Sequence, residues 1–401
     1  MSKTPSPDVP TTNISCIPFT TTPFTASFDF VPNVLFTTLR PLESSRYKTA
    51  STPLPVEGST KSPVVTPPPS AGVWGVIQGF GNYWTLVAAI DLGVFDAMES
   101  NQVNTAALLA KELDVGLEPL RHLLDALVSL GYCDQVNDFY ELTETSERYL
   151  TTNGPASMAA LVRGAPGPHQ NWTQLASTIR TGIVREPVEN DMAAFYGPLV
   201  EATYPTQLRA STRLGLRLGW TRRPNLKVLD LGAGMAPWAI GVLQSSPGST
   251  AVINDIPGVI ELAQKTINRL DLSARVEFRP GSFHEIDIEK DQYDIVVLGN
   301  VCRTEGDHLS QSLIARAHEG LKQGGSILVV DYFADNTRKF NPFGVQMGLT
   351  MLANTKRGGM LTNEQVVGWL KRAGFGAIRL MEPIGVHFVY VADKTPRAFT
   401  N

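Results

Sequence analysis

Hydrophobic residues recur at helical spacing in the first half of the chain. Apolar residues stand three and four positions apart over residues 74–98, 105–113 and 117–130. Because this spacing places them on one face, we expect a buried helix face in each segment. Two strand-like runs then flank Asn137 and Asp138. Two helices followed by paired strands form the order of a winged helix, which we predict here.

The second half of the chain has a different pattern, in which short apolar strands alternate with helical segments. An apolar run at 226–231 leads through glycines into an apolar helix, and further runs follow at 249–255, 293–298 and 326–333. This alternation predicts a parallel sheet covered by helices. We therefore expect an α/β domain of the Rossmann-like kind, which binds nucleotides at the carboxyl ends of its strands.

The first 72 residues follow neither pattern. They consist largely of Ser, Thr and Pro, so we expect a disordered extension. The segment is poor in acids and has scattered Arg and Lys, which leaves an organelle transit peptide as the alternative. The chain is thus predicted to comprise an extension (1–72), a mainly helical domain (73–218) and an α/β domain (219–397).

Charge and composition limit the classes of partner that the protein is expected to bind. The net charge of −4 offers no basic surface for nucleic acid, and the candidate recognition helix contributes mainly Arg121 and His122. No apolar run approaches the roughly 20 residues that span a bilayer. Cys16, Cys133 and Cys302 lie far apart and form no zinc-binding pair. We predict a small-molecule substrate, no nucleic acid, membrane or metal, and a cytoplasmic location.

A glycine-rich turn follows the first strand of the α/β domain. Gly232 and Gly234 allow a tight turn and close approach of a ligand, and Asp230 precedes them. Asp230 is suited either to the ammonium group of a ligand or to the N–H groups of the loop itself. Asp255 ends the next strand, at the interval of a ribose-binding acid. These residues fit a nicotinamide dinucleotide and S-adenosylmethionine equally.

The order of the downstream segments distinguishes the two cofactors. Residues 276–298 give a strand, a turn at Gly281–Phe283 and a further strand, and the motif LKQGGSILVVDYF follows a helix at 309–321. Together with RTG at 180–182, LDLGAG and the late segment MLANTKRGGMLTNEQVVGWLKRAGF, this order covers residues 74–393. The chain resembles the small-molecule O-methyltransferases typified by plant caffeate and bacterial polyketide enzymes.

The resemblance implies S-adenosylmethionine as the cofactor and a class I methyltransferase sheet of seven strands, mostly parallel, ending in an antiparallel hairpin. It also implies that the winged-helix domain forms a homodimer and covers the substrate. The cofactor contacts it implies, together with Asp230 from the loop, fall on these positions: Asp230, Gly232, Gly234, Asp255, Ile256, Ser282, Phe283 and Asn300.

The chain departs from the family where the catalytic base is expected. Phenol-methylating members carry a His-Asp pair, and the corresponding positions here hold Arg303 and Thr304. Neither accepts a proton at neutral pH. Met360 also replaces an acid that braces the family's histidine. The sequence therefore predicts a divergent member without the catalytic histidine.

A nucleophile that is already acidic needs little help from a base, because positioning supplies much of the rate. We expect C-methylation, or methylation of an acidic hydroxyl, with Arg303 pairing with the anion and Glu305 as a second catalytic candidate. Glu305, His308 and His387 are the remaining candidate bases. The alternative interpretation of Arg303 is a structural ion pair with Glu305 or Asp307.

Two further functions stay open from the sequence. The fold can retain S-adenosylmethionine while catalysing a cyclisation or rearrangement, or the winged helix can serve a regulator that senses this ligand. For the substrate pocket of a methyltransferase we predict four lining residues, two in a loop broken by proline and glycine and two in the late segment: His169, Trp172, Met347 and Met351.

Overall fold

The computed structural model describes residues 71–101, 103–164, 167, 169–339 and 341–395. The predicted extension therefore lies outside the described residues, apart from Ala71 and Gly72, which begin the first helix. Within the described ranges, no helix is both long and apolar enough to cross a bilayer.

The amino-terminal module is mainly helical, as the apolar spacing predicts. Its elements are α1 (Ala71–Asp91), α2 (Val94–Ser100), α3 (Ala106–Glu112), α4 (Leu117–Ser129), β1 (Cys133–Val136), β2 (Phe139–Leu142) and α5 (Glu144–Tyr149). The strands β1 and β2 pair antiparallel through the turn at Asn137–Asp138. This confirms the winged-helix prediction. Leu109, Leu120 and Leu124 lie in its core, whereas Leu108, an apolar residue of the predicted segment 105–113, is exposed.

A helical segment connects this module to the sheet. It comprises α6 (Ala159–Gly164), α7 (His169–Thr173), α8 (Leu175–Thr181), the 3-10 turn η1 (Val188–Asn190), α9 (Met192–Leu218) and the turn η2 (Trp220–Arg222). We expected an irregular loop at 164–182, but α7 and α8 occupy most of it. The side chain of Asp191 caps α9 by accepting a hydrogen bond from Ala194 N at 3.0 Å.

The α/β domain contains a seven-stranded sheet of order β10-β11-β7-β6-β3-β4-β5. The strands are β3 (Lys227–Leu231), β4 (Thr250–Asp255), β5 (Val276–Pro280), β6 (Tyr293–Gly299), β7 (Leu321–Asp331), β10 (Gly376–Leu380) and β11 (Phe388–Asp393). The five strands β3 to β7 are parallel, and β11 pairs antiparallel with β7 and β10. This confirms the predicted sheet. The strand order reverses between β3 and β6, where open α/β sheets bind ligands.

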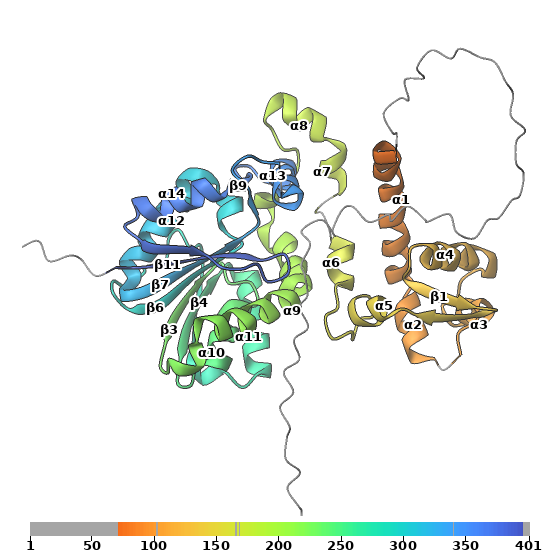
Figure 1. Cartoon of the computed structure of the whole chain (residues 1–401), viewed down its shortest axis with the longest axis horizontal. Coiled ribbons are helices and arrows are strands. Elements are labelled where there is room, and N and C mark those ends of the chain that lie inside the picture. Colours follow the sequence, from red (N-terminus) through yellow and green to blue (C-terminus); the bar gives the residue numbers. More distant parts are fainter. Residues whose placement is uncertain (1–70, 102, 165–166, 168, 340, 396–401) are drawn as a thin grey trace, which may run out of the picture. The chain divides into compact units, whose positions relative to one another are not determined.

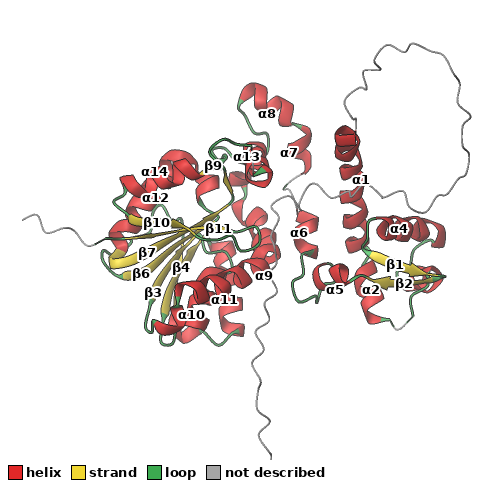
Figure 2. Cartoon of the chain, viewed as in Figure 1, coloured by secondary structure: helices red, strands yellow, loops and turns green. Residues whose placement is uncertain are grey.

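Helices cover both faces of the sheet (Figures 1 and 2). On one face, α9, α10 (Pro237–Ser245) and α11 (Pro257–Arg269) bury Leu214, Ile240 and Ile267. On the other face, α12 (Cys302–Gly320) and α14 (Asn363–Arg372) bury Leu313 and Trp369. The remaining elements are η3 (Ser273–Arg275), β8 (Phe333–Ala334), α13 (Pro342–Asn354) and β9 (Leu361–Thr362).

Helix α9 approaches α10 closely because small residues meet at the crossing. A Cβ atom on Gly241 of α10 would lie 2.0 Å from Ser211 Oγ of α9. Ser211 Oγ in turn donates a hydrogen bond to Trp238 O at 3.1 Å. Since α10 begins at the glycine-rich turn, this crossing also fixes the position of that turn.

We expect Gly241→Ala to lower the free energy of unfolding by roughly 1–3 kcal/mol, because the added methyl overpacks the α9–α10 crossing. Thermal and urea denaturation measure the change. Ser211→Gly should restore most of the loss when combined with Gly241→Ala. Gly197→Ala is the matched control on α9, where a Cβ meets nothing within 4 Å. An equal loss in Gly197→Ala would show that the crossing is not the cause.

Candidate functional site

The glycine-rich turn between β3 and α10 uses backbone conformations that favour glycine. Gly232 has φ 65° and Gly234 has φ 58°, both in the left-handed region. A Cβ on Gly232 would lie 2.8 Å from Val301 Cγ2 and 3.3 Å from the ring of Phe283, and one on Gly234 would lie 2.9 Å from Val200 Cγ1. The two glycines thus leave room for the side chains of Val301, Phe283 and Val200. They also allow the close approach of a ligand that the sequence predicts.

Two carboxylates lie behind this turn. Asp255, at the end of β4, accepts hydrogen bonds from Gly234 N at 2.7 Å and from Ile256 N at 2.8 Å. Asp230, at the end of β3, is fully buried and accepts one from Ala239 N at 3.1 Å. Burial raises the pKa of both groups, that of Asp230 to about 7 with a contribution from the nearby charge of Asp255.

Both alternatives that the sequence left for Asp230 have support in these contacts. Its Oδ2 holds the start of α10, and its buried Oδ1 has no hydrogen-bond partner among the described residues. A buried carboxylate oxygen without a donor is costly, and a cationic ligand removes that cost.

Asn254 is a candidate site residue that the sequence analysis did not identify; its only signal is that it is a polar residue inside an apolar strand. Its Nδ2 donates to Arg279 O at 2.7 Å and Gly281 O at 2.9 Å, while its buried Oδ1 has no partner in the described chain. The turn it anchors carries Ser282, whose Oγ accepts a hydrogen bond from His284 N at 3.2 Å, and Phe283, which contacts Gly232.

These groups fit S-adenosylmethionine, which carries a positive sulfonium and a positive ammonium group. One buried carboxylate (Asp230) and one partly buried carboxylate (Asp255) lie at this turn, at the switch point of the sheet, together with two buried acceptor oxygens that have no partner among the described residues. Such a surface favours a cationic nucleoside over the anionic pyrophosphate of a dinucleotide. Among the described residues, no group of three His, Cys, Asp or Glu side chains could hold a metal ion.

Arg303, at the start of α12, is held by Asp331 at the end of β7. Its Nη1 donates to Asp331 Oδ1 at 2.9 Å and to Asn300 Oδ1 at 2.9 Å, and its backbone N donates to Asp331 Oδ2 at 3.1 Å. The Arg303 side chain is 11% exposed and that of Asp331 is 0% exposed. The buried Nε of Arg303 has no hydrogen-bond partner in the described part of the chain.

The structure therefore corrects the ion pair proposed from the sequence, which had Glu305 or Asp307 as the partner of Arg303. Glu305 Oε2 instead lies 2.8 Å from His284 Nε2. Asp307 accepts hydrogen bonds from Trp369 Nε1 and from Gln311 Nε2. Glu305 stays a catalytic prediction.

An aromatic group adjoins this ion pair. Arg303 Cζ lies 5.0 Å from the ring centre of Tyr332, and the His387 ring stacks on Tyr332 with centroids 6.1 Å apart. The His387 ring also meets the edge of Trp238, with centroids 6.1 Å apart. Gln207 Oε1 of α9 accepts hydrogen bonds from Trp238 Nε1 at 3.0 Å and Asn300 Nδ2 at 3.3 Å.

The four residues predicted to line the substrate pocket lie on α7 and α13, two helices in contact. Asn171 Nδ2 of α7 donates to Asn354 Oδ1 of α13 at 3.0 Å. His169 Nε2 lies 3.0 Å from the Tyr83 hydroxyl and its ring is 5.0 Å from that of Trp84. Met351 is buried. Their role as substrate-lining residues stays a prediction, as does that of Trp172 and Met347.

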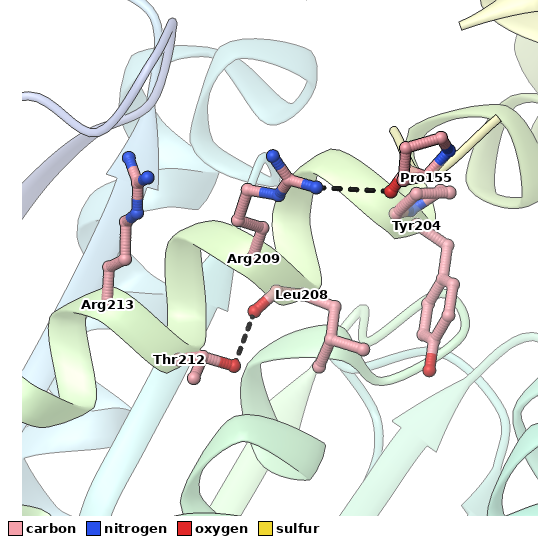
Figure 3. Close-up of a pocket in the computed structure, with 7 residues that line it drawn as sticks. Pro155, Tyr204, Leu208, Arg209, Thr212 and Arg213 are labelled. Atoms are coloured by element: carbon pink, nitrogen blue, oxygen red, sulfur yellow. Dashed lines mark hydrogen bonds between the residues drawn. The ribbon is translucent and has the colours of Figure 1, made fainter. Parts of the chain in front are cut away.

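An open pocket of about 550 Å³ lies on the outer side of α9 (Figure 3). Arg209 Nη2 donates to Pro155 O at 3.1 Å across it, and Tyr204 and Arg213 also line it. It holds none of the residues predicted for the cofactor or the substrate. We therefore place the candidate site at the switch point of the sheet, not in this pocket.

We expect Asp255→Ala to weaken S-adenosylmethionine binding by roughly 1–3 kcal/mol, through loss of charge-assisted hydrogen bonds to the ribose. Titration calorimetry measures the change. Glu277→Ala on the neighbouring strand is the control, because that carboxylate is 58% exposed and pairs with Arg279. Unchanged binding by Asp255→Ala would refute the assignment of Asp255 to the cofactor.

The solved structures similar to this chain share its fold. Human N-acetylserotonin methyltransferase in complex with S-adenosylmethionine aligns with a TM-score of 0.71 at 23% identity, over 85% of this chain and 100% of that one. An O-methyltransferase family protein from Burkholderia thailandensis aligns with a TM-score of 0.71 at 22% identity, over 83% of this chain and 100% of that one.

Sequence comparison gives relatives with named reactions. The tetracenomycin polyketide synthesis 8-O-methyl transferase of Streptomyces glaucescens is 25% identical over 77% of this chain and 92% of its own length. Acetylserotonin O-methyltransferase of Bos taurus is 26% identical over 79% of this chain and 95% of its own length.

Two family models match the chain. The O-methyltransferase domain model matches residues 223–376, and the O-methyltransferase dimerisation domain model matches residues 74–152. The chain belongs to the family of small-molecule O-methyltransferases, enzymes that use S-adenosylmethionine as the cofactor.

Proposed function

We propose that the protein methylates a small aromatic or conjugated metabolite whose acceptor atom reacts as an anion. The observation that carries this proposal is Arg303, which stands where the family's histidine is expected and has a buried Nε without a partner among the described residues. A buried N–H donor without an acceptor is costly, and an anionic oxygen of the substrate would satisfy it.

The ion pair with Asp331 sets what Arg303 can do. Asp331 accepts a hydrogen bond from Nη1 and offsets part of the positive charge, while the buried Nε has no partner among the described residues. An ion-paired guanidinium with a free N–H donor stabilises a delocalised anion, such as a phenolate or enolate, without binding it as tightly as an isolated guanidinium. The ring of Tyr332 beside the guanidinium supplies an apolar surface for a flat substrate.

Oxygen is the acceptor atom that the relatives favour. The names of two relatives, from Streptomyces glaucescens and Streptomyces sahachiroi, specify 8-O-methyl and 3-O-methyl transfer, the second on a hydroxynaphthoate. A carbon atom of the same delocalised anion is the alternative acceptor, because both positions carry its charge. The cofactor supplies an electrophilic methyl group on sulfur, and we propose that Asp230, Gly232, Gly234, Asp255, Ile256, Ser282, Phe283 and Asn300 hold it.

Mass spectrometry tests this function directly. The enzyme is incubated with S-adenosylmethionine and a panel of hydroxynaphthoates, naphthols and enolised 1,3-dicarbonyl compounds. A product heavier by one methylene, formed together with S-adenosylhomocysteine, supports methyl transfer, and fragmentation assigns it to oxygen or carbon. An isomer formed without consumption of the cofactor would contradict it.

We expect Arg303→Lys to lower kcat/KM by about 10- to 100-fold while leaving the Kd for S-adenosylmethionine unchanged, because lysine keeps the charge beside Asp331 but has no Nε donor. Arg372→Lys, an exposed arginine of α14, is the control. Parallel losses of cofactor affinity and turnover would assign Arg303 a structural role instead.

We also propose that the amino-terminal module forms a homodimer through α1. Large apolar residues on this helix are exposed, among them Val76 at 78%, Phe80 at 72% and Ile77 at 55%. A contiguous apolar surface of this kind is typical of an interaction site. The match of this segment to the dimerisation domain of the family supports a second copy of the chain as the partner.

Charge placed on this face should dissociate the dimer. We expect Ile77→Glu combined with Phe80→Glu to shift the sedimentation coefficient from dimer to monomer, because each carboxylate would be buried at the interface without a partner. Gln78→Glu adds a charge to the same helix without removing apolar surface and is the control. A dimer that persists in the double variant would exclude α1 as the interface.

A further inference from the structure

We propose that His387 is the general base of this enzyme and accepts the proton of the substrate's hydroxyl group. The inference rests on the proposed function, methyl transfer to an acidic acceptor. It assigns the proton transfer to the turn between β10 and β11, since α12 carries Arg303 where the family's base is expected.

The pairing of β11 with β7 places His387 beside the ion pair. Phe388 is opposite Asp331 in the antiparallel register, so His387 lies next to Tyr332 at the carboxyl edge of the sheet. Backbone hydrogen bonds between Ile384 and His387, 3.0 and 3.2 Å long, close the turn. The imidazole is thus fixed by the sheet rather than by a flexible loop.

The ring of Trp238 lies between His387 and the glycine-rich turn. Trp238, the second residue of α10, meets the His387 ring edge-on. Trp238 also packs on the end of β6, where a Cβ on Gly299 would lie 3.0 Å from its Cδ1. His387 is therefore one side chain away from both the glycine-rich turn and the end of β6.

The imidazole of His387 is buried and accepts or donates no hydrogen bond within the part of the chain that the structure describes. Its exposed fraction is 3%, and neither Nδ1 nor Nε2 has a partner among the described residues. A histidine in a protein interior normally satisfies at least one ring nitrogen. A substrate hydroxyl next to Arg303 would supply the missing partner of His387 and of the Arg303 Nε together.

The surroundings keep the imidazole neutral and make it a weak base. Burial, together with the positive charge of Arg303, lowers the pKa of His387 to about 4. The other groups around it are Asp331, which pairs with Arg303, and the Tyr332 hydroxyl, whose pKa is raised by burial; Trp238 does not titrate. A weak base matches an acidic hydroxyl, such as a phenol conjugated to a carbonyl or the enol of a 1,3-dicarbonyl compound.

The step balances without a further reactant. The O–H bond of the substrate breaks and its proton moves to an imidazole nitrogen of His387, while an electron pair of the oxygen forms the bond to the methyl carbon. The carbon–sulfur bond breaks and its electron pair stays on sulfur, which leaves S-adenosylhomocysteine. The imidazolium beside Arg303 then releases its proton to solvent, because two adjacent positive charges repel each other.

The other candidate bases are less suited. Glu305 is bound to His284 at 2.8 Å, which occupies one of its oxygens. His308 is exposed on α12. Of the three bases predicted from the sequence, His387 is the buried one. Its ring contacts Trp238 and also Tyr332, the residue whose ring lies beside the Arg303 guanidinium.

The test compares wild type, His387→Asn, His387→Gln and the control His122→Asn, an exposed histidine of α4, with substituted naphthols as probes. Between about pH 6 and pH 9 we expect the His387 variants to lose about 100- to 10,000-fold in kcat/KM at the lowest pH. The loss should shrink tenfold per pH unit and vanish above the pKa of each naphthol, where the probe is already ionised. His122→Asn should match wild type throughout.

Equilibrium measurements separate catalysis from structure. Calorimetry should give unchanged Kd values of the His387 variants for S-adenosylmethionine, and for a naphthol in the presence of S-adenosylhomocysteine. A loss of the same size at every pH in both folded variants would overturn the role of His387 as the base. A wild-type enzyme that methylates no naphthol, hydroxynaphthoate or enol would instead overturn the proposed function on which the inference rests.

Discussion

The contact on which the proposed active site depends is the buried ion pair between Arg303 and Asp331. Both oxygens of Asp331 are used: Oδ1 accepts from Arg303 Nη1 and Tyr332 N, and Oδ2 accepts from Arg303 N. One carboxylate thereby fixes the end of β7, the start of α12 and the orientation of an aromatic ring. Removing either partner would leave an uncompensated charge in the interior, which is far more costly than losing a surface pair.

The ion pair also decides what chemistry the site can support. Arginine cannot act as a base, but in its ion pair with Asp331 it provides an N–H donor together with a partly offset positive charge. Its remaining field acts on His387 and lowers the pKa of that imidazole. The substitution at the family's base position is thus coupled to the properties of a residue more than eighty positions later in the sequence, and the two cannot be interpreted separately.

The sheet, the winged helix and the glycine-rich turn could be predicted from the sequence because local periods and spacings encode them. The partner of Arg303 could not, since Glu305 and Asp307 are near in sequence while Asp331 is near only once β6 and β7 pair. The same holds for His387, whose position follows from the register of β11 on β7. The two short helices at 169–181 were missed because prolines and glycines around them favour an irregular loop.

Helix α9 touches the active edge at several successive turns. Val200 crowds Gly234, Gln207 binds both Trp238 and Asn300, and Ser211 sits against Gly241. All of these contacts lie on one helix, which carries Pro198 and Pro205 in its interior. We therefore expect substitutions on its inner face to change cofactor affinity and substrate preference together, because the same helix contacts both the glycine-rich turn and Asn300, the neighbour of Arg303.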